Sequence, residues 1–202
     1  MSRFVRLLRA TSGATAAEFA MVLPLLALFL VGMIDAGRLM WEINKAEKAT
    51  QMGVRYAVDT DPVMTELYTH SFAQTGEVLA GSAVPTTNFD KVTCTSSSCT
   101  CLPVAASICG TVTRNGTAFT NIYNRMHQID PLIGTSNVKI EYKNVGLGFA
   151  GDPNGPDVSA LVTVQLQNLS FRPLVLFGST SFTLPSFSSG LTLEDASGST
   201  SN

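Results

Sequence analysis

Gly13-Ala14-Thr15-Ala16-Ala17-Glu18-Phe19 leads directly into an apolar run from Ala20 to Ile34, and this stretch decides the fold of the chain. No charged residue interrupts it between Phe19 and Ile34. As an α-helix, the segment from Ala14 to Ile34 would be about 31 Å long, which matches a hydrocarbon core of about 30 Å. The stretch therefore predicts a transmembrane helix over residues 14–36.

The charges on either side of the run predict its orientation. Arg3, Arg6 and Arg9 precede it, and basic flanks tend to stay in the cytoplasm. Asp35 and Arg38 mark the expected exit into water. We therefore expect a single span with a cytoplasmic N-terminus and a large exported C-terminal portion.

Two simpler interpretations of the run compete with a specialised one. A secretory signal peptide needs small residues at a cleavage site after the apolar run, but Ile34 and Asp35 precede Ala36 here. An uncleaved signal anchor fits the hydropathy equally well. It leaves the carboxylate of Glu18 without an explanation.

Glu18 lies at the cytoplasmic edge of the predicted span, where a carboxylate is costly, by about 2.5 kcal/mol at mid-bilayer and less near the interface. Cleavage after Gly13, where the missing side chain lets the backbone enter a protease cleft closely, would give Ala14 a new α-amino group. This ammonium, in the same chain or a neighbour, would pair with Glu18 more strongly than in water. Between neighbours the pair would set the axial register. Alternatively, Glu18 reaches the interface or is protonated, and has no role.

A wider set of residues carries a resemblance to a known family: Gly13, Glu18-Phe19, Val22, Pro24-Leu25-Leu26, Gly32, Asp35, Gly37 and Arg38. Over about residues 10 to 42 the chain resembles the TadE/TadF-like pseudopilins. These are minor pilins of the tight-adherence (Tad/Flp) branch of type IV pili. The family's acid after the helix glycine is often Glu, and here it is Asp35. Major pilins of such systems are far shorter than 202 residues, so a minor component is implied.

The resemblance implies a processing site formed by Gly13, Ala14, Glu18 and Phe19. A membrane prepilin peptidase would remove the basic leader, residues 1–13, and the product would assemble or prime a pilus with other pilin or pseudopilin subunits. The implied location is the bacterial inner membrane, with the C-terminal domain in the periplasm and possible incorporation into a pilus.

Composition bounds the remaining possibilities. The net charge is −2 and the pI about 5.6, so nothing indicates a nucleic-acid partner. Charged residues make up only 14% of the chain, which is low for a cytosolic protein. Beyond the anchor, residues 61–195 are long enough to bury a core of their own.

Helical patterning continues past the span, so we expect the helix to run on through residues 37–60, with Pro62 ending it. Pro24 is expected to kink or loosen the helix inside the membrane. Small side chains beyond the membrane allow either close approach of a partner helix or packing on the chain's own sheet: Ala46, Ala49, Gly53 and Ala57.

The exported part predicts two further helices. Residues 65–80 are expected to form a short helix with Leu67, Phe72 and Leu79 as its apolar contacts. Residues 81–110, rich in Ser, Thr and Cys, predict a loop. Residues 117–130 predict a second helix, because the following positions have helical spacing: Phe119, Ile122, Tyr123, Met126 and Ile129.

The period then changes to that of strands. Residues 138–143 and 158–167 alternate apolar with polar side chains, and residues 182–193 suggest a third strand or a pair. This order predicts an α+β domain whose antiparallel sheet packs on the long N-terminal helix. Leu169 to Phe177 is notably apolar and is expected to bend into the core rather than form a docking patch. Residues 196–202 predict a flexible tail.

Four cysteines lie in the predicted loop 94–109, which outside the cytoplasm indicates disulfides. Two connectivities are favoured: Cys94–Cys99 with Cys101–Cys109, or Cys94–Cys101 with Cys99–Cys109. The alternative, a zinc site, matches the usual ligand spacing poorly.

The sequence shows no convincing catalytic constellation, so we expect no enzyme, cofactor or metal. His70 and His127 are the only histidines and are expected on helix surfaces. Asp152 to Asp157 has oxygen donors suited to calcium, but its prolines and glycines favour a plain turn. Besides a pilin-like subunit, an uncleaved anchor carrying an extracytoplasmic adhesion or binding domain fits the sequence.

Overall fold

The computed structural model describes residues 12–174, 180–194 and 196–199. The chain separates into two compact units. The helical unit comprises residues 1–42 and 171–182, and the sheet unit comprises residues 43–170 and 183–202. The predicted α+β class is confirmed, and each unit is described by itself below.

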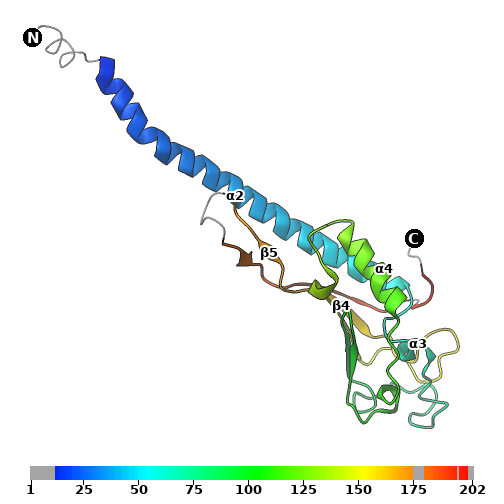
Figure 1. The fold of residues 1–202 in the computed structure, drawn as a ribbon. Helices are drawn as coiled ribbons and strands as arrows, with labels where there is room; N and C mark the ends of the chain where they lie inside the picture. The colour runs from blue at the N-terminus through cyan, green and yellow to red at the C-terminus, as the bar shows by residue number, and fades with distance from the viewer. Residues whose placement is uncertain (1–11, 175–179, 195, 200–202) are drawn as a thin grey trace, which may run out of the picture. The chain divides into compact units, whose positions relative to one another are not determined.

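A single long helix, α2 (Ser12–Asp59), forms the N-terminal part of the described chain (Figure 1). It confirms the continuous helix expected over residues 14–60. Its apolar portion is long enough to cross a membrane, and none of that portion is buried in the structure. The helix continues through Pro24 without interruption.

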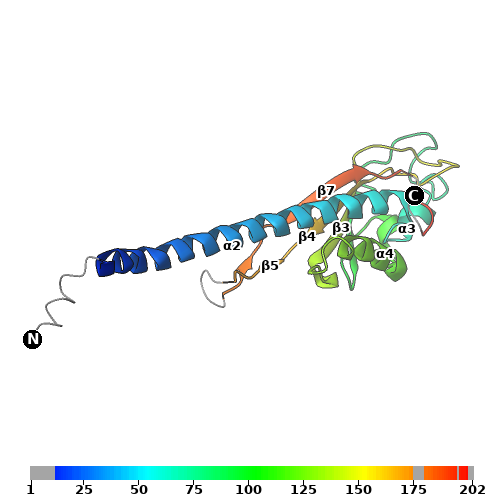
Figure 2. The same cartoon turned by 90° about the horizontal axis from the view of Figure 1, so that it is seen from above.

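The sheet unit contains a five-stranded antiparallel sheet in the order β2-β1-β3-β4-β7. The strands are β1 (Lys91–Cys94), β2 (Cys99–Leu102), β3 (Val138–Lys143), β4 (Leu161–Leu166) and β7 (Phe187–Thr192). Figure 2 shows β3, β4 and β7 beside the C-terminal half of α2. A separate two-stranded sheet pairs β5 (Ser170–Phe171) with β6 (Phe182–Thr183).

In the two central strands, the alternation of apolar and polar residues in the sequence matches an alternation of buried and more exposed side chains. In β3 and β4 every second residue is buried: Val138, Ile140, Tyr142, Val162, Val164 and Leu166. The region expected to hold a third strand or a pair contains two strands, β6 and β7, which belong to different sheets. β7 is hydrogen-bonded to β4 along its whole length, which places it at one edge of the sheet.

Helix α4 (Gly116–His127) lies alongside the C-terminal half of α2 (Figure 1). It begins where the Asn115 side chain accepts a hydrogen bond from the N–H of Ala118, at 3.0 Å, as N-cap residues do. It buries Phe119, Ile122 and Met126, as expected, and ends three residues earlier than expected.

The small residues of α2 face the core of their own unit. Ala46, Ala49 and Ala57 are completely buried. A Cβ placed on Gly53 would lie 2.7 Å from Met126 Cγ and 3.3 Å from Val164 Cγ1. Of the two interpretations left open, packing within the chain is therefore correct.

Two expectations for the first half of the sheet unit were wrong. The expected helix over residues 65–80 is only α3 (Glu66–Thr69), and Leu79 is 82% exposed. The helix ends at His70, whose backbone is extended (φ −80°, ψ 126°), and two residues later the N–H of Phe72 donates to Asp157 Oδ2 at 2.7 Å. The expected loop over residues 81–110 contains β1, β2 and a 3₁₀ turn at Ser107–Cys109, because the cysteine-rich segment forms a hairpin.

Part of the tail expected to be flexible over residues 196–202 makes hydrogen bonds to the end of α2 and to Asp61. The N–H of Asp61 donates to Gly198 O at 2.9 Å, and the N–H of Gly198 donates back to Asp61 Oδ1 at 2.8 Å. The Tyr56 hydroxyl donates to Ser199 O. These bonds tie residues 196–199 to the C-terminal end of α2, and residues 200–202 lie outside the described residues.

Candidate membrane anchor and processing site

The predicted processing site lies in the first two turns of α2. Gly13, Glu18 and Phe19 are exposed, and Ala14 is one helical turn from Glu18. A new α-amino group on Ala14 would therefore start one turn from the carboxylate of its own chain. The leader's Arg3, Arg6 and Arg9 lie outside the described residues.

Gly13 is helical in the unprocessed chain. The predicted approach to a protease cleft requires an extended backbone at this position. Space around it is open, since a Cβ added there would meet nothing within 4 Å. A peptidase that binds Gly13 in an extended form therefore has to unwind one helical turn, but it meets no packing from the described residues.

The apolar part of α2 is exposed on every side. Large apolar side chains point outward all round the helix between Phe19 and Ile34: Phe19, Met21, Val22, Leu23, Leu25, Leu26, Leu28, Phe29, Leu30, Met33 and Ile34. A helix that is apolar on all faces is suited to an apolar surrounding. The surface is consistent with a single-pass membrane anchor.

Asp35, expected to mark the exit into water, is instead almost completely buried, with 4% of its surface exposed. Its Oδ1 accepts a hydrogen bond from the N–H of Leu174 at 2.8 Å. Arg38 Nη1 lies 3.4 Å from the same oxygen and 3.5 Å from Arg172 O. The Arg38 guanidinium also lies 5.5 Å from the centre of the Phe171 ring.

We call this arrangement of Asp35, Arg38 and residues 171–174 the clasp. It holds a segment from far along the sequence against α2 within the helical unit. Residues 169–177 were expected to bend into the core. Phe171 is buried as expected, whereas Leu174 is 66% exposed. Residues 175–177 lie outside the described residues. Sequence reasoning missed the clasp, because nothing in the local sequence around Asp35 indicates a partner 139 positions away.

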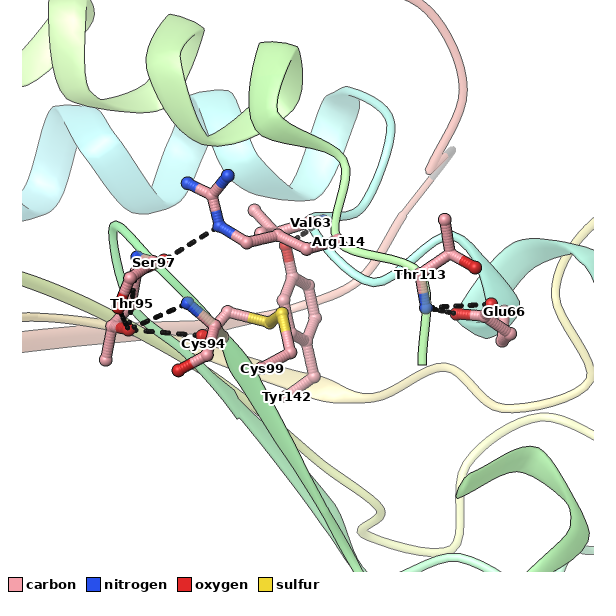
Figure 3. Close-up of a disulfide and its surroundings, with 10 residues drawn as sticks. Val63, Glu66, Cys94, Thr95, Ser97, Cys99, Thr113, Arg114 and Tyr142 are labelled. Atoms are coloured by element: carbon pink, nitrogen blue, oxygen red, sulfur yellow. Dashed lines mark hydrogen bonds between the residues drawn. A yellow bond between two sulfur atoms is a disulfide. The ribbon is translucent and has the colours of Figure 1, made fainter. Parts of the chain in front are cut away.

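The cysteines form Cys94–Cys99 and Cys101–Cys109 disulfides, the first of the two expected connectivities. All four sulfurs are used, so the zinc alternative is wrong. The first disulfide closes the β1–β2 hairpin at its turn (Figure 3). There Thr95 Oγ1 accepts hydrogen bonds from the N–H groups of Ser97 and Ser98.

Arg114 connects this hairpin to α4 (Figure 3). Its Nε donates to Thr95 O at 3.0 Å, and its guanidinium lies 4.8 Å from the centre of the Phe119 ring. Nearby, the buried Tyr142 hydroxyl accepts the N–H of Val63 at 3.1 Å, and burial raises the pKa of Tyr142 well above its ordinary value. The hairpin contributes Val92, Cys94 and Cys101 to the buried core of the sheet unit.

Both histidines are hydrogen-bonded within the sheet unit. His127 Nδ1 lies 2.9 Å from Ile133 O, and His70 Nε2 lies 3.1 Å from Ser107 Oγ. A hydrogen bond from the Ser107 side chain, ahead of the other contributions, lowers the pKa of the neighbouring Glu77. Within the described part of the chain, no group of three or more His, Cys, Asp or Glu is placed to hold a metal ion.

The segment from Asp152 to Asp157 is the expected turn. Asp157 uses one carboxylate oxygen for the N–H of Phe72 and the other for the N–H of Gly151, at 2.7 and 2.9 Å. Asp152 Oδ1 accepts the N–H of Asn154 at 2.9 Å. The carboxylates thus satisfy backbone groups of the turn.

Comparison with known proteins adds one finding. Residues 13–55 match the family model described as TadE-like protein. No curated protein and no solved structure is a significant match to the chain. The matched region begins at Gly13 and contains Glu18, the whole apolar run and the clasp residues Asp35 and Arg38.

Proposed function

We propose that this chain, whose residues 13–55 match the TadE-like family model, acts in the Tad pilus system as a minor pilin-like subunit processed by a prepilin peptidase after Gly13. The family match carries the proposal, because it starts at Gly13 itself. The geometry supports it, because Glu18 lies one turn from the residue that processing would expose.

In this proposal, processing creates the charge that Glu18 needs. Among the packed apolar helices of neighbouring subunits, the Ala14 ammonium meets the Glu18 carboxylate where the attraction is larger than in water. If the ammonium comes from a neighbouring subunit, the contact fixes the axial position of one helix against the next. A buried polar pair sets register in coiled coils in the same manner.

The sheet unit then serves as the exported portion of a structural subunit, without enzymatic activity. Two disulfides suit an oxidising compartment such as the periplasm. With α2 as the span, the N-terminus lies in the cytoplasm and the sheet unit in the periplasm or on a pilus. The proposed partners are the inner membrane, the prepilin peptidase and other pilin or pseudopilin subunits.

The decisive experiment is the intact mass and N-terminal sequence of the protein extracted from membranes of cells with an active Tad system. We expect a chain that begins at Ala14. Gly13→Leu should retain residues 1–13, because the added side chain obstructs the close approach of the peptidase. Gly37→Leu is the matched control, since Gly37 is also a helical glycine with open space around it, and should be processed normally.

An uncleaved anchor that carries an adhesion or binding domain is the second candidate. The helical conformation of Gly13 favours it, because no extended cleavage segment is preformed. It predicts an intact Met1 or Ser2 terminus in cells that form pili. Recovery of that terminus would overturn the processed-subunit proposal.

A further inference from the structure

We propose that the outer end of the anchor enters the lipid interface through two chain segments: α2 as far as Trp41, and residues 171–174. The clasp joins the two segments. This inference goes beyond the pilus role and requires only that α2 spans a membrane. It moves the outer boundary of the membrane-contacting surface from Asp35, where the sequence alone places it, to Trp41.

The first step is that Asp35 does not present its charge to the surroundings. Its side chain is buried, and its carboxylate faces the N–H of Leu174 and the guanidinium of Arg38. A charged group that is hydrogen-bonded and paired costs less to place at membrane depth than a bare one. The Asp35 position therefore does not force the helix out of the membrane.

The outward surface stays apolar beyond Asp35. Met40 is 60% exposed and Trp41 is 67% exposed, and Glu42 is the next acid along the helix. Arg38 is the one basic residue between Phe19 and Trp41, and a long arginine side chain can place its charge nearer the headgroups than its backbone. Apolar surface thus continues directly from the span to Trp41.

Helix length places Trp41 in the interfacial layer. From Phe19 to Trp41, α2 covers about 33 Å, whereas the hydrocarbon core is about 30 Å thick and the whole bilayer about 40–45 Å. With Phe19 at the inner boundary, Trp41 falls just outside the hydrocarbon on the outer side. Tryptophan is enriched at this level.

The clasp gives two backbone groups of residues 171–174 an internal partner. The segment also carries one exposed charge, that of Arg172, whose long side chain can place its guanidinium nearer the headgroups than its backbone. Backbone polar groups at membrane depth need internal partners, and here Asp35 accepts the N–H of Leu174 while Arg38 donates to Arg172 O. The Leu174 side chain remains 66% exposed. Because Leu174 is bound at the level of Asp35, it should lie about 9 Å nearer the bilayer centre than Trp41.

The chain offers a direct probe, since Trp41 is its only tryptophan. The full-length protein is reconstituted in phosphatidylcholine vesicles, and Trp41 fluorescence is measured with lipids brominated at defined acyl positions and with aqueous iodide. We expect strong quenching by bromine near the headgroup, weaker quenching by deep bromine, and little quenching by iodide. Strong iodide quenching without bromolipid quenching would overturn the assignment of Trp41, and shielding from both quenchers would indicate a protein partner instead.

The second segment is tested by Leu174→Trp in a Trp41→Phe background. Bromolipids should quench this tryptophan with a deeper optimum than Trp41. A matched control is Tyr68→Trp in the same background, because Tyr68 is an exposed aromatic residue of the sheet unit. The control should be quenched by iodide and not by bromolipids, and the same behaviour at position 174 would overturn the proposal for residues 171–174.

The role of the clasp is tested by Asp35→Ala in the Leu174→Trp protein. We expect most of the bromolipid quenching at position 174 to be lost, while Asp35→Asn, which keeps a hydrogen-bond acceptor, should retain more of it. Unchanged quenching in both variants would show that the clasp does not hold the segment in lipid. None of these measurements depends on leader processing. A negative quenching result would therefore overturn this inference and leave the proposed function to be tested by the N-terminal sequence.

Discussion

Asp35 accepts a hydrogen bond from the main-chain N–H of Leu174, 139 positions further along the chain, with 2.8 Å between N and Oδ1. The acceptor is a carboxylate, and hydrogen bonds to charged groups contribute about 1.5–3 kcal/mol. Asp35→Ala should therefore release the Leu174 amide and increase its hydrogen-exchange rate about 10- to 150-fold. Hydrogen exchange of the detergent-solubilised full chain measures this directly.

The amides of strand β7 serve as the internal control for that experiment, because β7 is paired with β4 and not with the clasp. Their exchange should not change in Asp35→Ala. Equal exchange at Leu174 in the variant and the natural chain would show that the carboxylate contributes nothing to holding this segment.

Gly53 tests how tightly α2 packs in the sheet unit. Gly53→Ala would place a methyl group 2.7 Å from Met126 Cγ, and Met126 is completely buried. Overpacking of this kind costs about 1–3 kcal/mol, which exceeds or offsets a gain in helix propensity of about 1 kcal/mol. We expect a net loss of about 1 kcal/mol in the free energy of unfolding, measured by denaturant titration in detergent.

Gly37→Ala is the matched control, because a Cβ there would meet nothing within 4 Å. This variant gains helix propensity without a clash and should not destabilise the protein. If Gly53→Ala proves as stable as Gly37→Ala, the Met126 side chain can move away from the added methyl group without cost, and α2 is not tightly packed at Gly53.

The spacing of apolar residues predicted those helices and strands whose apolar side chains are the ones buried in the structure. The continuous helix, the alternating strands β3 and β4, and the face of α4 that carries Phe119 and Met126 were all predictable in this way. Each of these elements is long enough for its apolar period to show.

The missed features depend on partners that are remote in sequence. α3 stops at the extended His70, and the chain beyond it is held by Asp157, from a distant turn, which accepts the N–H of Phe72. Strands β1 and β2 have only four residues each and are rich in Thr and Cys, so their period is too short to separate them from a loop. The clasp joins Asp35 to Leu174, and no local pattern reports such a pair.

The disulfides should contribute measurably to the stability of the sheet unit. Cys94–Cys99 and Cys101–Cys109 have sequence separations of 5 and 8, and loop-closure entropy for such short loops gives about 2–3 kcal/mol each. Replacing either pair by serines should lower the free energy of unfolding by about this amount, measured by denaturant titration. If the crossed connectivity were present instead, removing Cys94 with Cys99 would also leave Cys101 and Cys109 as free thiols, which a thiol-labelling assay detects.

Tyr142 predicts a specific loss of stability at alkaline pH. Burial raises its pKa in the folded chain, while the unfolded value is about 10. The neutral phenol therefore stabilises the folded state fully below about pH 10, and this contribution declines as the pH rises further, by about 1.4 kcal/mol per pH unit. Tyr142→Phe lacks this dependence.

At neutral pH, Tyr142→Phe should be less stable by about 1–3 kcal/mol, because the buried N–H of Val63 loses its acceptor. The difference in unfolding free energy between the two proteins should then narrow above pH 10. Parallel denaturant titrations from pH 7 to about pH 11 test this difference directly. A constant difference across that range would mean that the Tyr142 hydroxyl ionises without opening the core.

Glu18 provides the sharpest test of the proposed register mechanism in cells. Glu18→Gln keeps the size of the side chain and removes its charge, so membrane insertion and leader removal should both continue. Assembly should fail, because the Ala14 ammonium of a processed chain no longer meets an anionic partner. Sheared pilus fractions and the N-terminal sequence of the membrane fraction measure assembly and processing in the same culture. Glu47→Gln, which neutralises an exposed acid further along α2, should assemble normally. If the Glu18→Gln protein enters the pilus fraction as efficiently as this control, the carboxylate does not set the axial position of the subunit, and another contact of the helix must do so.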